Sequence, residues 1–221
     1  MPSRLSVSVP WPLSIASEAI AAAGFSGLLF DGARPGSGVT EAIRQALHML
    51  VSIPPGPAGD PTLACHGRDI EQAPALQRIV YLSTIGVYGD AGGGWVDETS
   101  PTNPGAERSR ARLAAEEAWS GLGRATGRRI VILRLAGIYG PGRSALDSLR
   151  AGTARRIVKP GQVFNRIHVA DVAASIVAAL SNPDAHGIYN VCDDEPAPPQ
   201  DVVAHAAGLL AVPPPPEVAF A

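Results

Sequence analysis

The sequence predicts an α/β fold in which a doubly wound, mostly parallel sheet carries helices on both faces. Short apolar runs alternate with helix-like segments from residue 27 to residue 191, and the connections are long enough for β–α–β crossovers. Several of these runs end in polar or glycine-rich turns, as strands do at the carboxyl edge of an open sheet. With 221 residues, 46% of them hydrophobic, the chain can build one domain with a substantial core.

The individual elements follow from apolar spacing, capping residues and chain breakers. Leu5, Val7 and Val9 alternate with polar residues, which is typical of a short strand, and Thr40 is placed to cap a helix. Pro54-Pro55 ends the strand that follows that helix. We expect strands over 5–9, 27–31 (buried), 48–53, 78–83, 130–135 and 187–191, and helices over 14–23, 40–47, near 69, and over 107–120, 144–151, 171–180 and 198–210.

The composition excludes several classes of protein and site. A net charge of −2 gives no electrostatic case for binding nucleic acid or an anionic membrane. No run approaches the ~20 apolar residues that cross a bilayer. Cys65 and Cys192 form neither a disulfide framework nor a metal-binding motif. We therefore expect a cytoplasmic protein with no metal site.

Three segments place polar groups where strands end, and together they carry a resemblance. They are YLSTIGVYG at 81–89, RLAGIYGPGR at 134–143 and FNRIHVADV at 164–172. They resemble the extended short-chain dehydrogenase/reductases, the NAD-dependent epimerase/dehydratase family, over roughly residues 25–210. The resemblance implies a Rossmann-like fold, NAD or NADP as cofactor, and hydride transfer at an alcohol or carbonyl carbon of a small, nucleotide-sugar-like molecule. It also implies a homodimer through the 107–120 helix.

The same resemblance implies roles for single residues. The Thr84 hydroxyl would hydrogen-bond the reacting oxygen of the substrate, next to Ser83 on the cofactor side. Leu135, Tyr139 and Gly140 would lie against the nicotinamide ring. The other interpretation of these segments is structural, with a strand end that caps the next turn and a tight turn without a ligand.

Two further residues have both a functional and a structural interpretation. Asp31 resembles the family's acidic residue that meets the adenine amino group, but Asp31-Gly32 also fits a simple turn. His168 can face the pocket as an acid–base group, or it can be a packed histidine. Asp171 is expected to cap the helix that it opens.

The sequence departs from the family where the catalytic pair belongs. Family members have Tyr-x-x-x-Lys on the helix after the long loop, and here Arg108 and Arg112 occupy those two positions. Arg112 can still bind ribose hydroxyls. Arg108 cannot act as an acid or base near neutral pH, because an arginine guanidinium stays protonated in proteins. Tyr88, Tyr139 and His168 are the available substitutes.

The second departure concerns the glycine-rich turn that holds the pyrophosphate. The nearest match, Gly36-Ser-Gly38, has Glu41 where the third glycine belongs. If 27–31 is the family's third strand, the first strand and its glycine loop are missing, so we expect an N-terminally incomplete sheet and weak or no affinity for NAD or NADP. We expect one domain over 1–221, with a doubtful N-terminal segment at 1–24 and a smaller, substrate-side portion within 140–221. The alternatives to an oxidoreductase are a catalytically silent NAD(P)-binding sensor or scaffold and a non-binding fragment.

Overall fold

The computed structural model describes residues 6–7, 20 and 22–220, which form two compact units. Unit 1 contains the described residues up to Ser83 together with 106–133 and 179–188. Unit 2 contains 84–105, 134–178 and 189–220. Each unit is described by itself below, and the expectation of a single domain stays a prediction.

The main sheet has the order β3 (His48–Val51), β4 (Arg78–Thr84), β5 (Arg129–Leu135) and β9 (Gly187–Val191). Most of it belongs to unit 1, and residues 84, 134–135 and 189–191 at the strand ends are counted in unit 2. β3 and β4 run parallel, with Val51 opposite Tyr81. Val80 and Val131 are fully buried on the face opposite to the one that Ile79 and Tyr81 occupy, so both faces of the sheet are covered. The predicted α/β class with a mostly parallel sheet is confirmed.

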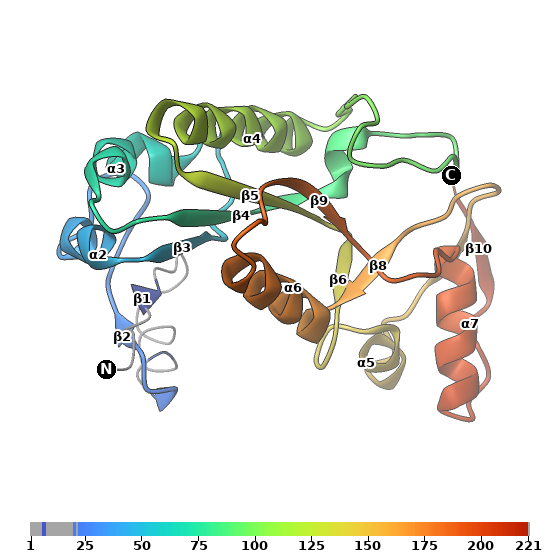
Figure 1. The fold of residues 1–221 in the computed structure, drawn as a ribbon. Helices are drawn as coiled ribbons and strands as arrows, with labels where there is room; N and C mark the ends of the chain where they lie inside the picture. Colours follow the sequence, from blue (N-terminus) through green and yellow to red (C-terminus); the bar gives the residue numbers. More distant parts are fainter. Residues whose placement is uncertain (1–5, 8–19, 21, 221) are drawn as a thin grey trace. The chain divides into compact units, whose positions relative to one another are not determined.

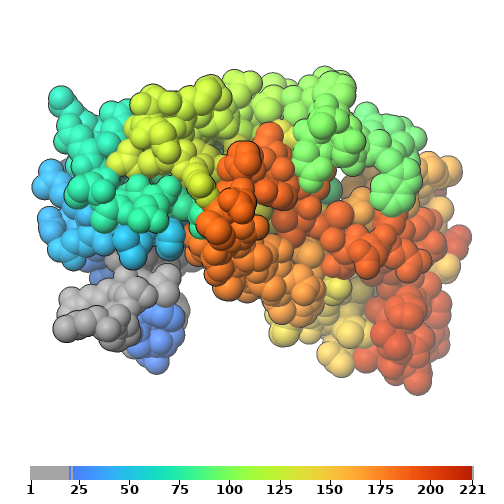
Figure 2. All heavy atoms as spheres, viewed as in Figure 1, coloured from blue at the N-terminus to red at the C-terminus, as the bar shows by residue number. Residues whose placement is uncertain are grey.

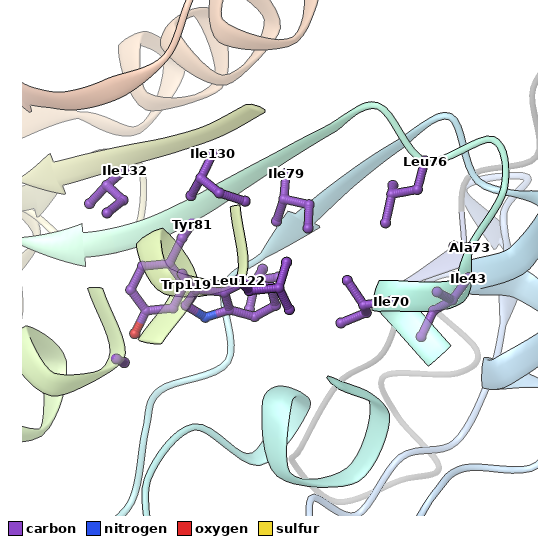
Figure 3. Close-up of a cluster of buried hydrophobic side chains, with 12 residues drawn as sticks. Ile43, Ile70, Ala73, Leu76, Ile79, Tyr81, Trp119, Leu122, Ile130 and Ile132 are labelled. Carbon is purple, nitrogen blue, oxygen red and sulfur yellow. The ribbon is translucent and has the colours of Figure 1, made fainter. Parts of the chain in front are cut away.

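One face of this sheet packs against α2 (Val39–Gln45), α3 (Pro61–Gln72) and α4 (Glu107–Thr126), and Figure 1 shows α4 lying along β4 and β5. Apolar side chains from these helices meet those of the strands in one cluster (Figure 3). Trp119 lies at its centre beside Tyr81, with ring centroids 6.0 Å apart. The members of the cluster are Ile43, Val51, Ile70, Ala73, Leu76, Ile79, Tyr81, Ala115, Trp119, Leu122, Ile130 and Ile132.

Two helix ends in unit 1 differ from the prediction. The N-cap of α2 is Gly38, in the left-handed region with φ 78°, while the Thr40 hydroxyl donates to Asp69 Oδ2 instead of capping. α4 does not end near Gly121 and continues to Thr126, with Gly127 as C-cap at φ 72°. Gly123 is a contact position, because a Cβ there would lie 2.5 Å from Ile130 Cγ1. It lets the helix approach β5 closely.

The N-terminal part of unit 1 also differs from the prediction. The strand expected over 27–31 is only β2 (Ser26–Gly27), which is exposed and pairs in parallel with β1 (Ser6–Val7). Of the residues that follow β2 in that run, Phe30 alone is buried. The apolar residues of the 27–31 run therefore do not form a buried strand. Leu5 and Val9, and the greater part of the helix expected over 14–23, lie outside the described residues.

Unit 2 contains two small parallel pairs of strands and several short helices. β6 (Gly137–Tyr139) pairs with β8 (Arg166–His168), and β7 (Arg156–Val158) pairs with β10 (Glu217–Ala219). These four strands were not predicted, because each has three residues and too short a run to show a two-residue alternation. The helical elements are η1 (Ile85–Tyr88), α5 (Ala145–Arg150), α7 (Pro199–Leu209) and α6 (Val169–Ser181), whose last three residues belong to unit 1.

The long loop expected over 90–104 is present and lies at the surface of unit 2, where the green atoms of residues 84–105 are visible in Figure 2. The far end of the loop is tied to η1, because the Asn103 N–H donates to the Val87 carbonyl at 3.0 Å. Among the helices that the structure describes, none combines the length and apolarity that a membrane span requires.

Candidate functional site

At the carboxyl end of β4 in unit 1, polar side chains tie the strand to helix α4. The Ser83 hydroxyl donates to the carboxylate of Glu116, which is 2% exposed. Arg112 Nη1 donates to the Leu82 carbonyl at 2.6 Å and to the Tyr81 hydroxyl at 3.2 Å. Ser83 and Arg112 thus make structural contacts at the positions where the sequence predicts cofactor contacts. Their cofactor role stays a prediction.

Arg108 and Arg112, which stand in the family's tyrosine and lysine positions, differ in environment. Arg112 is half-buried, and its guanidinium carbon lies 5.7 Å from the centre of the Tyr81 ring. Arg108, one turn earlier on α4, is exposed. Ser109 and Trp119 are buried on the side of the helix that faces the sheet. The inward face of α4 therefore carries Arg112 without an acid–base partner at position 108.

The hydroxyl of Tyr81 gives unit 1 a measurable response to alkaline pH. Burial raises the pKa of Tyr81 to about 12 from its ordinary value of 10.0. Because the folded pKa is the higher one, the unfolded chain loses this proton first, and the associated stability is lost as pH rises from 10 to 12. Between pH 10 and pH 12 we expect Tyr81 to lower the free energy of unfolding of the unmodified protein by on the order of 2–3 kcal/mol. The Tyr81→Phe variant should not show this part of the alkaline loss.

Urea denaturation between pH 9 and 12 measures this effect, with spectrophotometric titration of the tyrosines as a second readout. Tyr189→Phe is the control, because the Tyr189 side chain is 42% exposed. Equal alkaline loss in the Tyr81→Phe variant and in the unmodified protein would contradict the prediction.

Asp31 forms a turn in an exposed part of unit 1. Its Oδ1 accepts the backbone N–H groups of Ala33 at 2.8 Å and Arg34 at 3.0 Å, and these bonds lower the pKa of the carboxyl. Oδ2 lies 3.8 Å from the Arg34 guanidinium. The turn interpretation of Asp31-Gly32 therefore describes its local geometry, and the ionised Oδ2 is still able to accept a hydrogen bond from an amino group.

In unit 2, Thr84 caps the short helix η1. Its Oγ1 accepts the Gly86 N–H at 3.1 Å, as in the structural interpretation of this motif. A hydroxyl that accepts one bond still has a proton to donate, so Thr84 can also hydrogen-bond a substrate oxygen.

Both the hydroxyl and the ring of Tyr88, at the end of η1, have partners in unit 2. Arg134 Nη1 donates to its hydroxyl at 2.8 Å and lies over its ring, and the hydroxyl donates to Asn190 Oδ1 at 2.9 Å. Its side chain is buried. Tyr88 therefore joins η1 to the residues around β9 and is a poor substitute for a catalytic tyrosine.

The segment expected at the nicotinamide runs from the end of β5 into β6. Leu135 is buried, and Tyr139 is half-buried opposite His168 in the β6–β8 pair, with ring centroids 5.3 Å apart in an edge-to-face arrangement. A hydrogen bond with the Asp193 carboxylate raises the pKa of Tyr139, so this phenol stays protonated near neutral pH. Gly140 is required by packing, because a Cβ there would lie 2.7 Å from Val169 Cγ1.

His168 has the capping role that the sequence analysis gave to Asp171. α6 begins at Val169, so Asp171 is within its first turn and is not its N-cap. The imidazole Nδ1 of His168 accepts the Ala170 N–H at 3.3 Å. The expectation for Asp171 is wrong because the helix is capped three residues earlier, at His168, where β8 ends. With Nδ1 engaged in this way, the neutral ring carries its proton on Nε2.

The Gly36-Ser-Gly38 turn fails as a phosphate cradle. The Gly36 N–H donates inward to His66 Nε2 at 3.3 Å, and a Cβ at Gly36 would lie 2.5 Å from the Leu29 carbonyl oxygen. Gly36 is therefore needed for close packing against the backbone of Leu29. The α2 helix that follows has seven residues, with Glu41 in its first turn. The negative charge of Glu41 opposes phosphate binding at this helix end.

The described residues include no group of three or more His, Cys, Asp or Glu side chains that could hold a metal ion. An open cleft of about 850 Å³ in unit 1 is lined by residues at the amino ends of β4 and β5, among them Arg78 and Arg129. Because ligands of open parallel sheets bind beyond the carboxyl ends of the strands, this cleft is not the candidate site.

The predicted residues are thus divided between two groups. Unit 2 holds Thr84, Leu135, Tyr139, Gly140 and His168, of which Tyr139 and His168 are in ring contact. Unit 1 holds Asp31, Ser83, Arg108 and Arg112.

The sequence did not indicate that Glu116 and His66 are buried polar residues or that Asp193 contacts Tyr139. A charged residue in an alanine-rich helix carries no local sign of burial, because burial depends on what packs against the helix.

The chain matches a known family over more than half of its length. Residues 64–192, more than half of the chain, match the NAD dependent epimerase/dehydratase family. Protein YeeZ of Escherichia coli K12 is 34% identical over 182 residues, which cover 79% of this chain and 63% of YeeZ. The chain thus spans less than two thirds of the length of that relative.

Two solved structures are also similar. A conserved protein of unknown function from Silicibacter pomeroyi is 45% identical, with a TM-score of 0.87 and coverage of 98% of this chain and 73% of that one. The dTDP-glucose 4,6-dehydratase of Bacillus anthracis, solved with NAD, has a TM-score of 0.80 at 16% identity, with coverage of 99% and 76%, and shows the fold alone. With the α/β sheet described above, these matches show that the chain belongs to the NAD-dependent epimerase/dehydratase family.

Proposed function

We propose that this chain binds NAD or NADP and acts in the cytoplasm as an oxidoreductase on an alcohol or carbonyl group of a small, nucleotide-sugar-like molecule. The observation that carries the proposal is the segment from Leu135 to Gly140. It leaves a buried strand, forms β6 and sets Tyr139 against His168, within the part of the chain that matches the family.

Each unit, taken by itself, offers groups whose chemistry suits part of the dinucleotide or the substrate. Asp31 offers a carboxylate oxygen to the adenine amino group, and half-buried Arg112 offers guanidinium N–H groups to ribose hydroxyls. The 135–140 segment offers a flat apolar edge to the nicotinamide, which when bound would supply or accept the hydride. Thr84 would donate its hydroxyl proton in a hydrogen bond that orients the substrate oxygen.

Because Gly36 is turned inward, we expect weak dinucleotide binding, with a Kd on the order of 0.1–1 mM for NADH or NADPH. The fluorescence of the reduced nicotinamide during titration with protein measures it. Arg112→Ala should weaken binding by about tenfold, and Arg124→Ala, which changes an exposed arginine of the same helix, should leave it unchanged. If binding shows no saturation up to about 10 mM NADH or NADPH, the proposed cofactor is contradicted.

A catalytically silent NAD(P)-binding protein is the second candidate, and the acid–base groups favour it. Arg108 is exposed and cannot exchange a proton near neutral pH. The pKa of Tyr139 is raised, and Nδ1 of His168 caps a helix. None of these three side chains is arranged as a general base in the described structure.

Restoring the family pattern separates the two candidates. If the chain is silent, the double variant Arg108→Tyr, Arg112→Lys should raise hydride transfer from UDP-glucose to NAD by about 10²–10⁴-fold over background, because general acid–base catalysis contributes that much. Absorbance of the reduced nicotinamide measures it, and Arg108→Phe with Arg112→Lys is the control without a hydroxyl. Turnover by the unmodified chain would contradict the silent candidate and support the oxidoreductase.

A further inference from the structure

The loop over 31–38 of unit 1 is held at one point by a buried histidine. The loop begins after Phe30, whose ring is buried against the edge of the His66 ring with centroids 5.2 Å apart. At its other end the Gly36 N–H donates to His66 Nε2 at 3.3 Å. Gly36 also packs so closely against the Leu29 carbonyl that a Cβ would find no room there.

His66 is itself fixed by α2 and α3. The side chain is 1% exposed, and Nδ1 lies 2.9 Å from Asp69 Oδ2, which also accepts the Thr40 hydroxyl at 2.9 Å. With both ring nitrogens engaged, the arrangement requires one tautomer. Nδ1 carries the proton and donates to Asp69, and the unprotonated Nε2 accepts from Gly36.

Asp31 depends on the same loop. Its carboxylate is oriented by the N–H groups of Ala33 and Arg34, so its direction follows the path of the backbone between Gly32 and Gly36. A loop that is released at Gly36 would let this turn, and the carboxylate with it, change orientation.

We propose that His66 is a positioning residue for dinucleotide binding, which holds the 31–38 loop so that Asp31 can meet the adenine ring. This inference rests on the proposed binding of NAD or NADP. It assigns no contact between His66 and the ligand. The effect is indirect: His66 holds Gly36, and Gly36 lies in the loop that orients Asp31.

The proposal has a pH signature, because a proton on Nε2 would turn the acceptor of the Gly36 bond into a donor. The hydrogen bond from His66 lowers the pKa of Asp69, so Asp69 stays ionised during mild acidification. A proton on Nε2 would therefore release Gly36 and leave the bond to Asp69 intact. The groups in contact with the ring are Asp69 from α3, Gly36 from the loop and Phe30 just before the loop. Thr40 and Arg44 from α2 act on Asp69.

The experiment compares the unmodified protein with His66→Gln and His66→Leu. Glutamine keeps a donor for Asp69 and an acceptor for Gly36, and leucine keeps neither. His205→Gln is the control, because His205 is an exposed histidine on α7. NMR gives two readouts between pH 8 and pH 5.5, the hydrogen-exchange protection factor of the Gly36 amide and the Kd values for ADP and for nicotinamide mononucleotide. Thermal unfolding shows that each variant is folded.

We expect His66→Leu to lower Gly36 protection and to weaken ADP binding by about tenfold, with less than a twofold change for nicotinamide mononucleotide. His66→Gln should bind ADP within about twofold of the unmodified protein and lose the pH dependence. Full Gly36 protection in His66→Leu, or equal ADP binding in all variants, would overturn the proposal alone. If the unmodified protein binds neither ligand, the proposed function fails and the adenine role with it, while Gly36 protection still reports on the loop.

Discussion

Trp119→Ala is expected to lower the free energy of unfolding by about 3–5 kcal/mol. The Trp119 side chain is completely buried at the centre of the cluster in Figure 3. Removing it leaves a cavity between α4 and the sheet. It also takes away the indole N–H that donates to Asp60 Oδ2 at 3.1 Å. Urea denaturation, followed by far-UV circular dichroism, measures the change.

The indole N–H can be tested separately from the ring volume. Asp60 is buried and caps α3 by accepting the N–H groups of Thr62 and Leu63. Trp119→Phe keeps an aromatic ring but removes a donor to this carboxylate, so we expect a smaller loss of about 1–3 kcal/mol. Trp95→Ala is the matched control, because Trp95 is 82% exposed and its removal should change stability by less than about 0.5 kcal/mol. Equal losses at positions 95 and 119 would contradict this account of the core.

Gly89→Ala is expected to destabilise unit 2 by at least about 3 kcal/mol. Gly89 ends η1 with φ 77° and ψ −148°, a combination that is nearly restricted to glycine and costs other residues about 1–3 kcal/mol. A Cβ at this position would also lie well inside van der Waals distance of the Asn103 carbonyl oxygen, which is backbone. The 90–104 loop would have to move away from η1. Loss of Gly89 therefore disturbs the turn that carries Thr84.

Gly92→Ala provides the control for backbone conformation alone. Gly92 also has a positive φ, 62°, but a Cβ there would meet no atom within 4 Å. We expect it to cost about 1 kcal/mol, the typical penalty of a left-handed residue. Urea denaturation of both variants measures the difference, and hydrogen exchange at the Asn103 amide, which bonds the Val87 carbonyl, shows whether the loop has moved. A Gly89→Ala variant as stable as Gly92→Ala would show that the loop is not fixed at Asn103.

The sequence predicted the strands of the main sheet well, because a central strand of a parallel sheet is a short apolar run. The runs at 78–83 and 130–135 became β4 and β5 within one residue at each end. The same reasoning failed at 27–31, where the run is mostly exposed. An apolar run shows which residues can be buried. Whether they are buried depends on whether another helix or strand covers them.

The motifs likewise determined the family and the segments that carry chemistry, because these features are local in the chain. The roles of single side chains depended on partners far away in the sequence. Ser83 meets Glu116, Arg112 meets the Leu82 carbonyl, and His66 meets Gly36. A hydrogen bond needs its two atoms within about 3 Å. Which residues come that close is decided when helix and strand pack together, so only the tertiary structure could show that Arg112 holds the end of β4 and that His66 fixes the 31–38 loop.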